Sequence, residues 1–135
     1  MGTSRIYFAA GGATAPALLE SVAGLGALVR LPSDECVVAT GPLSHNAPFV
    51  VTTAAVLLGN HVVLTPRFDP AETLQLVEKH RASWLNLVPT MMLRIWRLPD
   101  AVRLAADVCS LKVAFHLAAP CPPWLKQAWI DCPSR

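Results

Sequence analysis

Short apolar runs alternate along the chain with segments whose apolar residues recur at helical spacing. The runs predict five buried strands, at Arg5–Ala10, Glu35–Thr40, His61–Thr65, Ser83–Val88 and Leu111–Leu117. The segments between them predict helices at Ala17–Leu31, Ala47–Leu58, Pro70–Arg81, Pro89–Trp96, Asp100–Ala106 and Trp124–Asp131. Alternating strands and helices are typical of the α/β class, so we expect a mostly parallel sheet flanked by helices.

The segment His61–Val88 gives the clearest local signal for this class. Its two apolar runs flank a helix pattern that begins with Asp69 as the N-cap, Pro70 in the first turn and Glu72 three residues after the cap. A strand, a helix and a strand of this length form a βαβ unit with parallel strands and a right-handed crossover. We therefore predict that the two strands of this segment pair in parallel.

The stretch Gly41–Asn60 carries the most suggestive loop of the chain. Ser44 and His45 stand directly before an almost wholly apolar helix, for which Asn46 is the expected N-cap. Gly59 is expected to end this helix in a left-handed conformation. Because the helix interior holds only two polar residues, both threonine, we expect it to be buried on most sides. The loop then presents His45 from a rigid base.

The carboxyl ends of parallel strands lie at one edge of a sheet, and ligands bind at this edge in open α/β folds. Four loops are expected there: Gly11–Pro16, Gly41–Asn46, Pro89–Met91 and Leu117–Cys121. The residues in them that a ligand would meet are Thr14, Ser44, His45, Thr90, Ala118 and Ala119.

Composition limits the class of partner. The 135 residues suffice for one domain or a piece of a larger one, and 53% of them are hydrophobic while only 15% are charged. The net charge of +2 comes from scattered Lys and Arg without a basic run, which argues against nucleic acid as a partner.

No segment of the sequence is expected to cross a membrane. The longest continuous apolar part is about a dozen residues, against roughly 20 needed for a membrane span. The amino-terminal residues lack the pattern of a signal peptide.

The four cysteines predict reduced thiols and a cytoplasmic protein. They form neither CxxC pairs nor a dense framework of the kind found in small secreted domains. A zinc site formed by Cys121, Cys132 and a histidine is an alternative, but structural zinc sites favour shorter spacings between ligands.

Catalytic motifs that would identify a hydrolase are absent from the sequence. No serine stands in GxSxG, and no HExxH is present. His45 is an acid–base candidate because a histidine titrates near neutral pH, and a structural role is equally compatible with its position. The glycine turn Gly11–Thr14 follows a predicted strand and is suited to cradle a phosphate, although it lacks the lysine expected there; a simple tight turn is the alternative.

Three ordered segments resemble a known family. They are GPLSHNAPF from Gly41, GNHVVLTPRFDPAETLQLVEKHRASWLNLVPTMMLRIWRLP from Gly59, and HLAAPCPPWLKQAW from His116. Together they are similar to the large amino-terminal domain of acyl-CoA synthetases, adenylate-forming ligases that act on fatty or bile-acid-like carboxylates. The resemblance implies that residues 1–135 form a single partial AMP-binding domain. It also implies a reaction in which ATP and magnesium activate a carboxylic acid and the acyl group passes from AMP to coenzyme A.

The resemblance assigns roles to a few residues. His45 matches the histidine or aromatic position beside the acyl pocket, and Ala118, Ala119 and Pro120 match the small-residue loop that lines the adenine site. Thr14 matches a threonine of the family's phosphate loop. The sequence departs from that loop at Ala10, Ala13 and Ala15, where the family has hydroxyl-bearing residues or glycine, and at the missing lysine.

The family's chain continues beyond the position of Arg135 to a magnesium-holding motif, a ribose-binding aspartate and a small domain with a catalytic lysine. The expectation is therefore a truncated acyl-CoA synthetase-like protein that does not complete the reaction alone and has no catalytic residue of its own. The alternative is a noncatalytic acyl- or nucleotide-binding module, or an assembly module. Because a sheet without its covering layers leaves an edge strand and an apolar face exposed, we expect a homo-oligomer.

Overall fold

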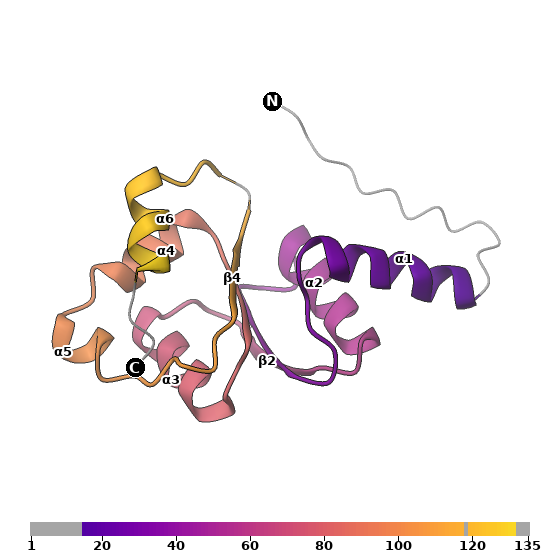
Figure 1. Ribbon diagram of the computed structural model, residues 1–135, viewed down its shortest axis with the longest axis horizontal. Coiled ribbons are helices and arrows are strands. Elements are labelled where there is room, and N and C mark those ends of the chain that lie inside the picture. The colour runs from indigo at the N-terminus through magenta and orange to yellow at the C-terminus, as the bar shows by residue number, and fades with distance from the viewer. Residues whose placement is uncertain (1–14, 118, 132–135) are drawn as a thin grey trace.

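The computed structural model describes residues 15–117 and 119–131. In this part of the chain four strands form one parallel sheet: β1 (Cys36–Thr40), β2 (His61–Thr65), β3 (Trp84–Leu87) and β4 (Val113–His116). Helices flank the sheet on both faces (Figure 1), which confirms the expected α/β class. The predicted strand Arg5–Ala10 lies outside the described residues.

The order of strands is β2-β1-β3-β4 and corrects one prediction. β2 and β3 are parallel but do not pair with each other, because β1 lies between them: Val37 is the register partner of both Val62 and Trp84. All five residues of β1 are buried. The most apolar strand therefore takes a central place, and the connection from β2 to β3 crosses over it.

Six helices complete the described part: α1 (Ala15–Leu28), α2 (Asn46–Leu57), α3 (Pro70–His80), α4 (Pro89–Trp96), α5 (Asp100–Arg103) and α6 (Pro123–Ile130). All six were predicted, with ends that differ by up to three residues. The expected turn at Ala15 and Pro16 is helical instead, since a proline fits the first turn of a helix. α1 ends before Arg30, which adopts a left-handed conformation with φ of 53°.

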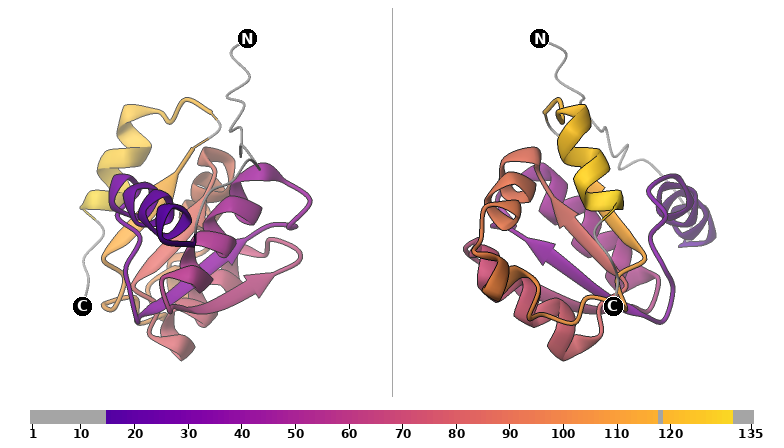
Figure 2. Two further views of the ribbon diagram at one scale, coloured as in Figure 1. Left: turned by 90° about the vertical axis from the view of Figure 1, so that its right-hand side faces the viewer. Right: turned by 60° about the vertical axis from the view of Figure 1, so that its left-hand side comes forward.

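Two clusters of buried apolar side chains lie between the sheet and the helices, one on each face. α1 and α2 cover one face of the sheet, and α3 to α6 lie on the other (Figures 1 and 2). Because side chains alternate along a strand, Val37 and Trp84 pack under α2, and their neighbours Val38 and Leu85 pack under α3 and α4. Trp84 is fully buried, donates from Nε1 to the carbonyl oxygen of Val29 at 3.1 Å and stacks on Phe115.

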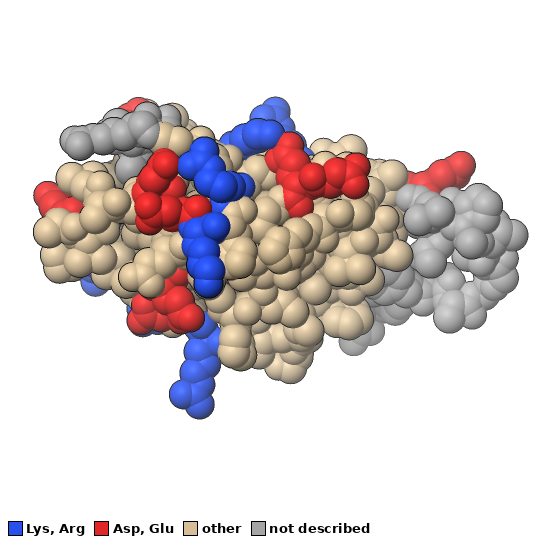
Figure 3. Space-filling model, turned by 90° about the horizontal axis from the view of Figure 1, so that it is seen from below, with Lys and Arg blue, Asp and Glu red and all other residues tan. Residues whose placement is uncertain are grey.

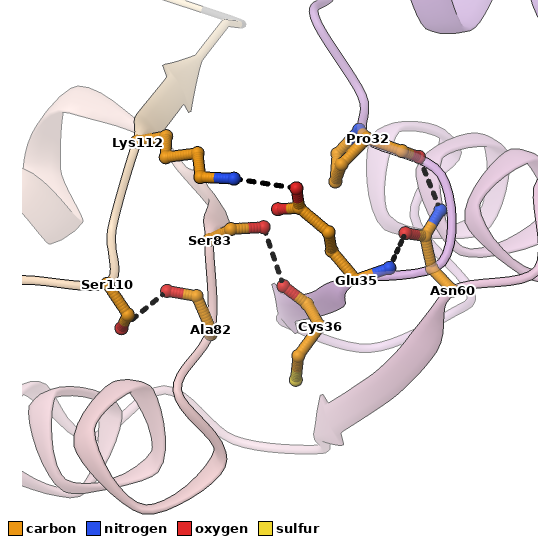
Figure 4. Close-up of polar contacts among 8 residues, drawn as sticks. All are labelled: Pro32, Glu35, Cys36, Asn60, Ala82, Ser83, Ser110 and Lys112. Carbon is orange, nitrogen blue, oxygen red and sulfur yellow. Dashed lines mark hydrogen bonds and ion pairs between the residues drawn. The ribbon is translucent and has the colours of Figure 1, made fainter.

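The amino edge of the sheet is tied together by hydrogen bonds (Figure 4). The buried side chain of Asn60 donates to the carbonyl oxygens of Pro32 (2.6 Å) and Ala55 (3.1 Å), and it accepts from the backbone N–H of Glu35 (3.1 Å). These contacts fix the segments that lead into β1 and β2. Gly59, with φ of 77°, makes the turn between α2 and Asn60, as predicted.

Charged side chains gather at the same edge. Lys112, before β4, pairs with Glu35, before β1, at 2.6 Å (Figure 4), and Arg81, before β3, pairs with Asp107 at 2.9 Å. Seen from below Figure 1, positive and negative side chains are interspersed (Figure 3). This edge therefore contributes to stability through neighbouring charges of opposite sign.

Candidate functional site at the carboxyl edge of the sheet

The loops that follow β1, β3 and β4 lie at one edge of the sheet, as predicted, because the strands are parallel. None of the residues 41–46, 88–91 and 117–121 is Asp, Glu, Lys or Arg. These three loops therefore contrast with the amino edge, where the ion pairs lie. The loop after the edge strand β2 ends at the same edge and carries Arg67 and Asp69. Thr14 and Ala118, both predicted for the site, lie outside the described residues.

Thr40 and Asn86 are buried at this edge, on the two central strands of the sheet. β1 connects toward β2 on one side and β3 toward β4 on the other, so the strand order reverses between β1 and β3. Such a switch point is where open α/β sheets bind ligands. The Thr40 hydroxyl donates to the carbonyl oxygen of Asn86 at 2.6 Å and lies 3.4 Å from the Met91 sulfur. These contacts fix the two loops relative to each other.

His45 occupies the end of the loop after β1. Gly41 has φ of 97°, a conformation that favours glycine, and its N–H donates to the carbonyl oxygen of Thr65 at 3.1 Å. The His45 N–H then donates to the carbonyl oxygen of Pro42 at 3.0 Å. Its side chain is exposed and has no hydrogen bond to any residue that the structure describes, which leaves the imidazole available to a ligand.

His45, and not Asn46, is the N-cap of α2, which corrects the prediction. His45 is extended (φ −92°, ψ 143°), and its carbonyl oxygen accepts from the N–H of Phe49 at 3.2 Å. Asn46 is the first helical residue and is exposed. The turn from Gly41 to His45 sets where the helix begins, so tertiary geometry overrides the preference of asparagine for the cap.

The expected burial of α2 on most sides is also wrong in part. Five of its residues are buried against the sheet and α1, as an apolar helix requires. However, Phe49 is 50% exposed, Val56 59% and Leu57 43%, so one apolar face is open among the described residues. Composition indicates that the helix lacks a polar face, but not whether anything covers its second apolar face.

The other predicted site residues lie on the neighbouring loops. Ser44 is exposed beside His45, and Thr90 is exposed in the first turn of α4, directly after β3. Ala119 and Pro120 are exposed in the loop between β4 and α6. The fold thus brings these three loops to one edge of the sheet and gives each an accessible surface.

Sequence reasoning missed the buried polar groups at this edge. Thr40 and Thr65 are register partners at the ends of β1 and β2, and Asn86 is the third residue of β3. The Oδ1 atom of Asn86 and the hydroxyl oxygen of Thr65 are buried without a hydrogen-bond partner in the described part of the chain. The signal was a single polar residue at or near the end of each apolar run.

The described residues do not offer a metal site. No group of three or more His, Cys, Asp or Glu side chains in residues 15–117 and 119–131 is arranged to hold a metal ion. The loops after β1, β3 and β4 carry no carboxylate, the ligand that magnesium prefers, and the carboxylate of Asp69 after β2 accepts from the N–H of Glu72 as the cap of α3. Thus the residues present do not fit the magnesium ion that the resemblance implies. Among the helices of the same residues, none has the length and apolar character needed to cross a membrane.

Comparison with known proteins agrees with this fold. The N-terminal domain of FACL13 from Mycobacterium tuberculosis superposes with a TM-score of 0.74 at 15% identity, over 82% of this chain and 27% of that one. The amide bond synthetase McbA from Marinactinospora thermotolerans superposes with a TM-score of 0.67 at 22% identity, over 78% of this chain and 21% of that one. The fold is therefore that of the amino-terminal domain of adenylate-forming enzymes.

The sequence itself gives the family. Residues 13–134 match the AMP-binding enzyme family, and the chain belongs to it. It is 37% identical over 86 residues to the 4-coumarate–CoA ligase-like protein 8 of Arabidopsis thaliana. It is 33% identical over 82 residues to the medium/long-chain-fatty-acid–CoA ligase FadD8 of M. tuberculosis. These matches take in 62% and 61% of this chain but only 15% and 14% of the relatives, so the chain spans about one seventh of their length.

Proposed function

We propose that this acyl-CoA synthetase-like chain binds a carboxylic acid, or its acyl adenylate, at the carboxyl edge of the sheet and does not complete the ligase reaction alone. The observation that carries the proposal is the convergence of three uncharged loops, with the accessible imidazole of His45, at the switch point of a sheet with this family's fold. Ligands of open α/β sheets bind at such a point.

The proposed roles follow the family resemblance. His45 lies beside the carboxyl or acyl group and donates a hydrogen bond to it, since its side chain is exposed and has no partner among the described residues. Ala118, Ala119 and Pro120 line the adenine, where small side chains leave room for a flat ring. Thr14 contacts a phosphate oxygen. The acid is fatty or aromatic, because the relatives are named for medium- and long-chain fatty acids and for 4-coumarate.

The proposed lack of turnover has an electrostatic reason. The family reaction uses ATP, magnesium and coenzyme A, and charge on the reacting phosphate must be stabilised in the transition state. The three loops assigned to the ligand, after β1, β3 and β4, supply no lysine, arginine or carboxylate. The loop after the edge strand β2 holds Arg67 and Asp69, and the Asp69 carboxylate accepts from the N–H of Glu72 as the cap of α3. Binding of the acid or adenylate requires none of these groups, so the chain retains recognition without the charges for phosphate chemistry.

An ATP–pyrophosphate exchange assay tests this part of the proposal. The purified chain is supplied with ATP, magnesium and a panel of fatty, aromatic and cyclic acids, and a full-length synthetase serves as the positive control. We expect no exchange above the acid-free background. Robust exchange that depends on the acid would show that the chain completes adenylation and would overturn the proposed incompetence.

An assembly role is the second candidate, and one surface favours it. Phe49 and Val56 of α2 are at least half exposed, and Leu64 of the edge strand β2 is 44% exposed. An open strand edge beside exposed apolar side chains favours self-association. We expect light scattering to give the mass of a homo-oligomer, and a monomer across the accessible concentration range would exclude this role.

We place the protein in the cytoplasm. Cys36, Cys109 and Cys121 are free thiols in the described part of the chain, and thiols remain reduced in that compartment. Fractionation of cells that produce the protein with an epitope tag tests the location, and recovery in a secreted or membrane fraction would contradict it.

A further inference from the structure

A cavity of about 450 Å³ lies on the face of the sheet opposite α2, between β3, β4 and the helices α3 to α6. Its wall is mostly apolar and includes Leu85 of β3, Met92 and Trp96 of α4, and Trp129 of α6. Small-molecule sites have volumes of about 300–1,000 Å³ and walls of this kind. None of the residues assigned to the carboxyl-edge site lines it.

The charged residues that line this cavity all have one sign. They are Arg103, Lys112 and Lys126, and no Asp or Glu lines the cavity with them. Arg103 and Lys112 each form an ion pair of 2.6 Å with a carboxylate outside the lining. Lys126, on α6, has no ion pair with any residue that the structure describes. Its ammonium group is therefore available to an anion in the cavity.

Buried nitrogen atoms without a hydrogen-bond partner gather at the same place. In residues 15–117 and 119–131 three side chains have such an atom: Arg103 (Nε), His116 (Nδ1) and Trp129 (Nε1). All three residues line this cavity, whereas the buried oxygen atoms without a partner belong to residues that do not. The arginine and tryptophan nitrogens can only donate. The missing partners of these two atoms are therefore acceptors, such as the oxygens of an anion, and His116 Nδ1 can donate to the same group when it carries the proton.

The pKa of His116 also indicates that the cavity favours a negative group. Burial of the ring lowers the pKa of His116, and the positive charge of Lys126 lowers it further. The cavity therefore disfavours another positive charge, and a negative group bound there would raise the pKa of His116 again.

We propose that this cavity binds an apolar organic anion, with an aliphatic or aromatic body against the tryptophans and one carboxylate-type head group toward Lys126 and His116. The site is separate from the carboxyl-edge site and goes beyond the proposed function. The ligand is recognised by an apolar wall, one available cation and buried donors that lack acceptors.

Titration with octanoate, followed by the ¹⁵N-resolved indole N–H signals, tests this site. We expect saturable shifts of the signals of Trp129 and Trp96, which line the cavity, and little change for Trp84, which packs on the opposite face. Octanol and octylammonium match the tail without the negative charge. We expect both to bind at least about tenfold more weakly, because they lose the contact with Lys126 and offer no charged acceptor to the buried donors.

Substitutions test the residues that line this cavity. We expect Lys126→Gln to weaken octanoate binding about three- to tenfold, in the range of a partly exposed ion pair, and Lys79→Gln on exposed α3 surface to leave it unchanged. Ala114→Leu, which fills space beside β4, should reduce binding further. No saturable shift, equal binding of octanol, or an unchanged Lys126→Gln variant would each overturn the proposal.

Discussion

The hydroxyl of Thr40 donates a 2.6 Å hydrogen bond to the carbonyl oxygen of Asn86, and this contact joins the ends of β1 and β3 where the strand order reverses. Both residues are buried, with 1% and 4% of their surface exposed. His45 follows Thr40 by five residues, and Thr90 follows Asn86 by four. The geometry of the proposed ligand edge therefore depends on a pair of residues that a ligand does not need to touch.

Replacing Thr40 by valine should destabilise the fold. The shape is kept but the donor is lost, so the buried carbonyl of Asn86 loses this partner, and we expect a decrease of about 1–2 kcal/mol in the free energy of unfolding. The control is Thr53→Val, which removes a hydroxyl that donates to the carbonyl oxygen of Phe49 at 2.9 Å but is exposed, so water can replace it. We expect a change within about 0.5 kcal/mol there. Equal effects in urea denaturation would show that burial of the Thr40 bond is unimportant.

Asn60 should be more important for stability than its polar character suggests. Asn60→Ala removes three hydrogen bonds at a position that is 8% exposed, and the expected loss in urea denaturation is about 2–4 kcal/mol. Asn46→Ala is the matched control, since Asn46 is exposed and does not cap α2. Its expected effect is within about 0.5 kcal/mol. A loss of about 1 kcal/mol, the usual value of an N-cap, would contradict the assignment of His45 to that position.

The ion pair of Glu35 and Lys112 should make stability depend on pH below neutrality. The hydrogen bond from the Lys112 ammonium group lowers the pKa of Glu35 below its ordinary value of 4.5. A carboxyl group whose pKa is lowered by folding stabilises the fold above that ordinary value, and the contribution is lost as the pH falls through the folded-state pKa.

Lys112→Gln should therefore lower the free energy of unfolding at pH 7, by less than about 1 kcal/mol because the pair is partly exposed. The difference from the unsubstituted chain should shrink below pH 4.5. Lys79→Gln makes the same change of charge on the surface of α3 and serves as the control. Denaturation curves between pH 3 and pH 7 that stay parallel for the Lys112 variant would exclude this contribution.

Local signals predicted most of the secondary structure. The strand His61–Thr65 was predicted residue for residue, and the start of α3 followed from Asp69, whose carboxylate accepts from the N–H of Glu72 at 2.9 Å. Both depend on the backbone and on neighbouring side chains. The strand order was not predicted, because nothing within His61–Val88 indicates that β1 will lie between β2 and β3.

The site was predicted less completely, for the same reason. Parallel strands placed the loops of His45, Thr90 and Ala119 at one edge without further information. The contact between Thr40 and Asn86 joins residues 46 positions apart. The cavity wall joins helices that are farther apart still, and no spacing along the chain indicates that Leu74 of α3 and Trp129 of α6 share it. Features that arise from packing between distant segments are visible only in the fold.

Calorimetric titration with a non-hydrolysable acyl-AMP analogue tests the proposed function most directly. We expect saturable one-to-one binding, at least about tenfold weaker for His45→Ala, as the loss of a hydrogen bond to a charged group would produce. His61→Ala is the control, because His61 is also exposed but begins β2 at the amino edge of the sheet. Its affinity should equal that of the unsubstituted chain. Absence of binding, or equal affinity of the two histidine variants, would contradict the assignment of ligand recognition to the carboxyl edge.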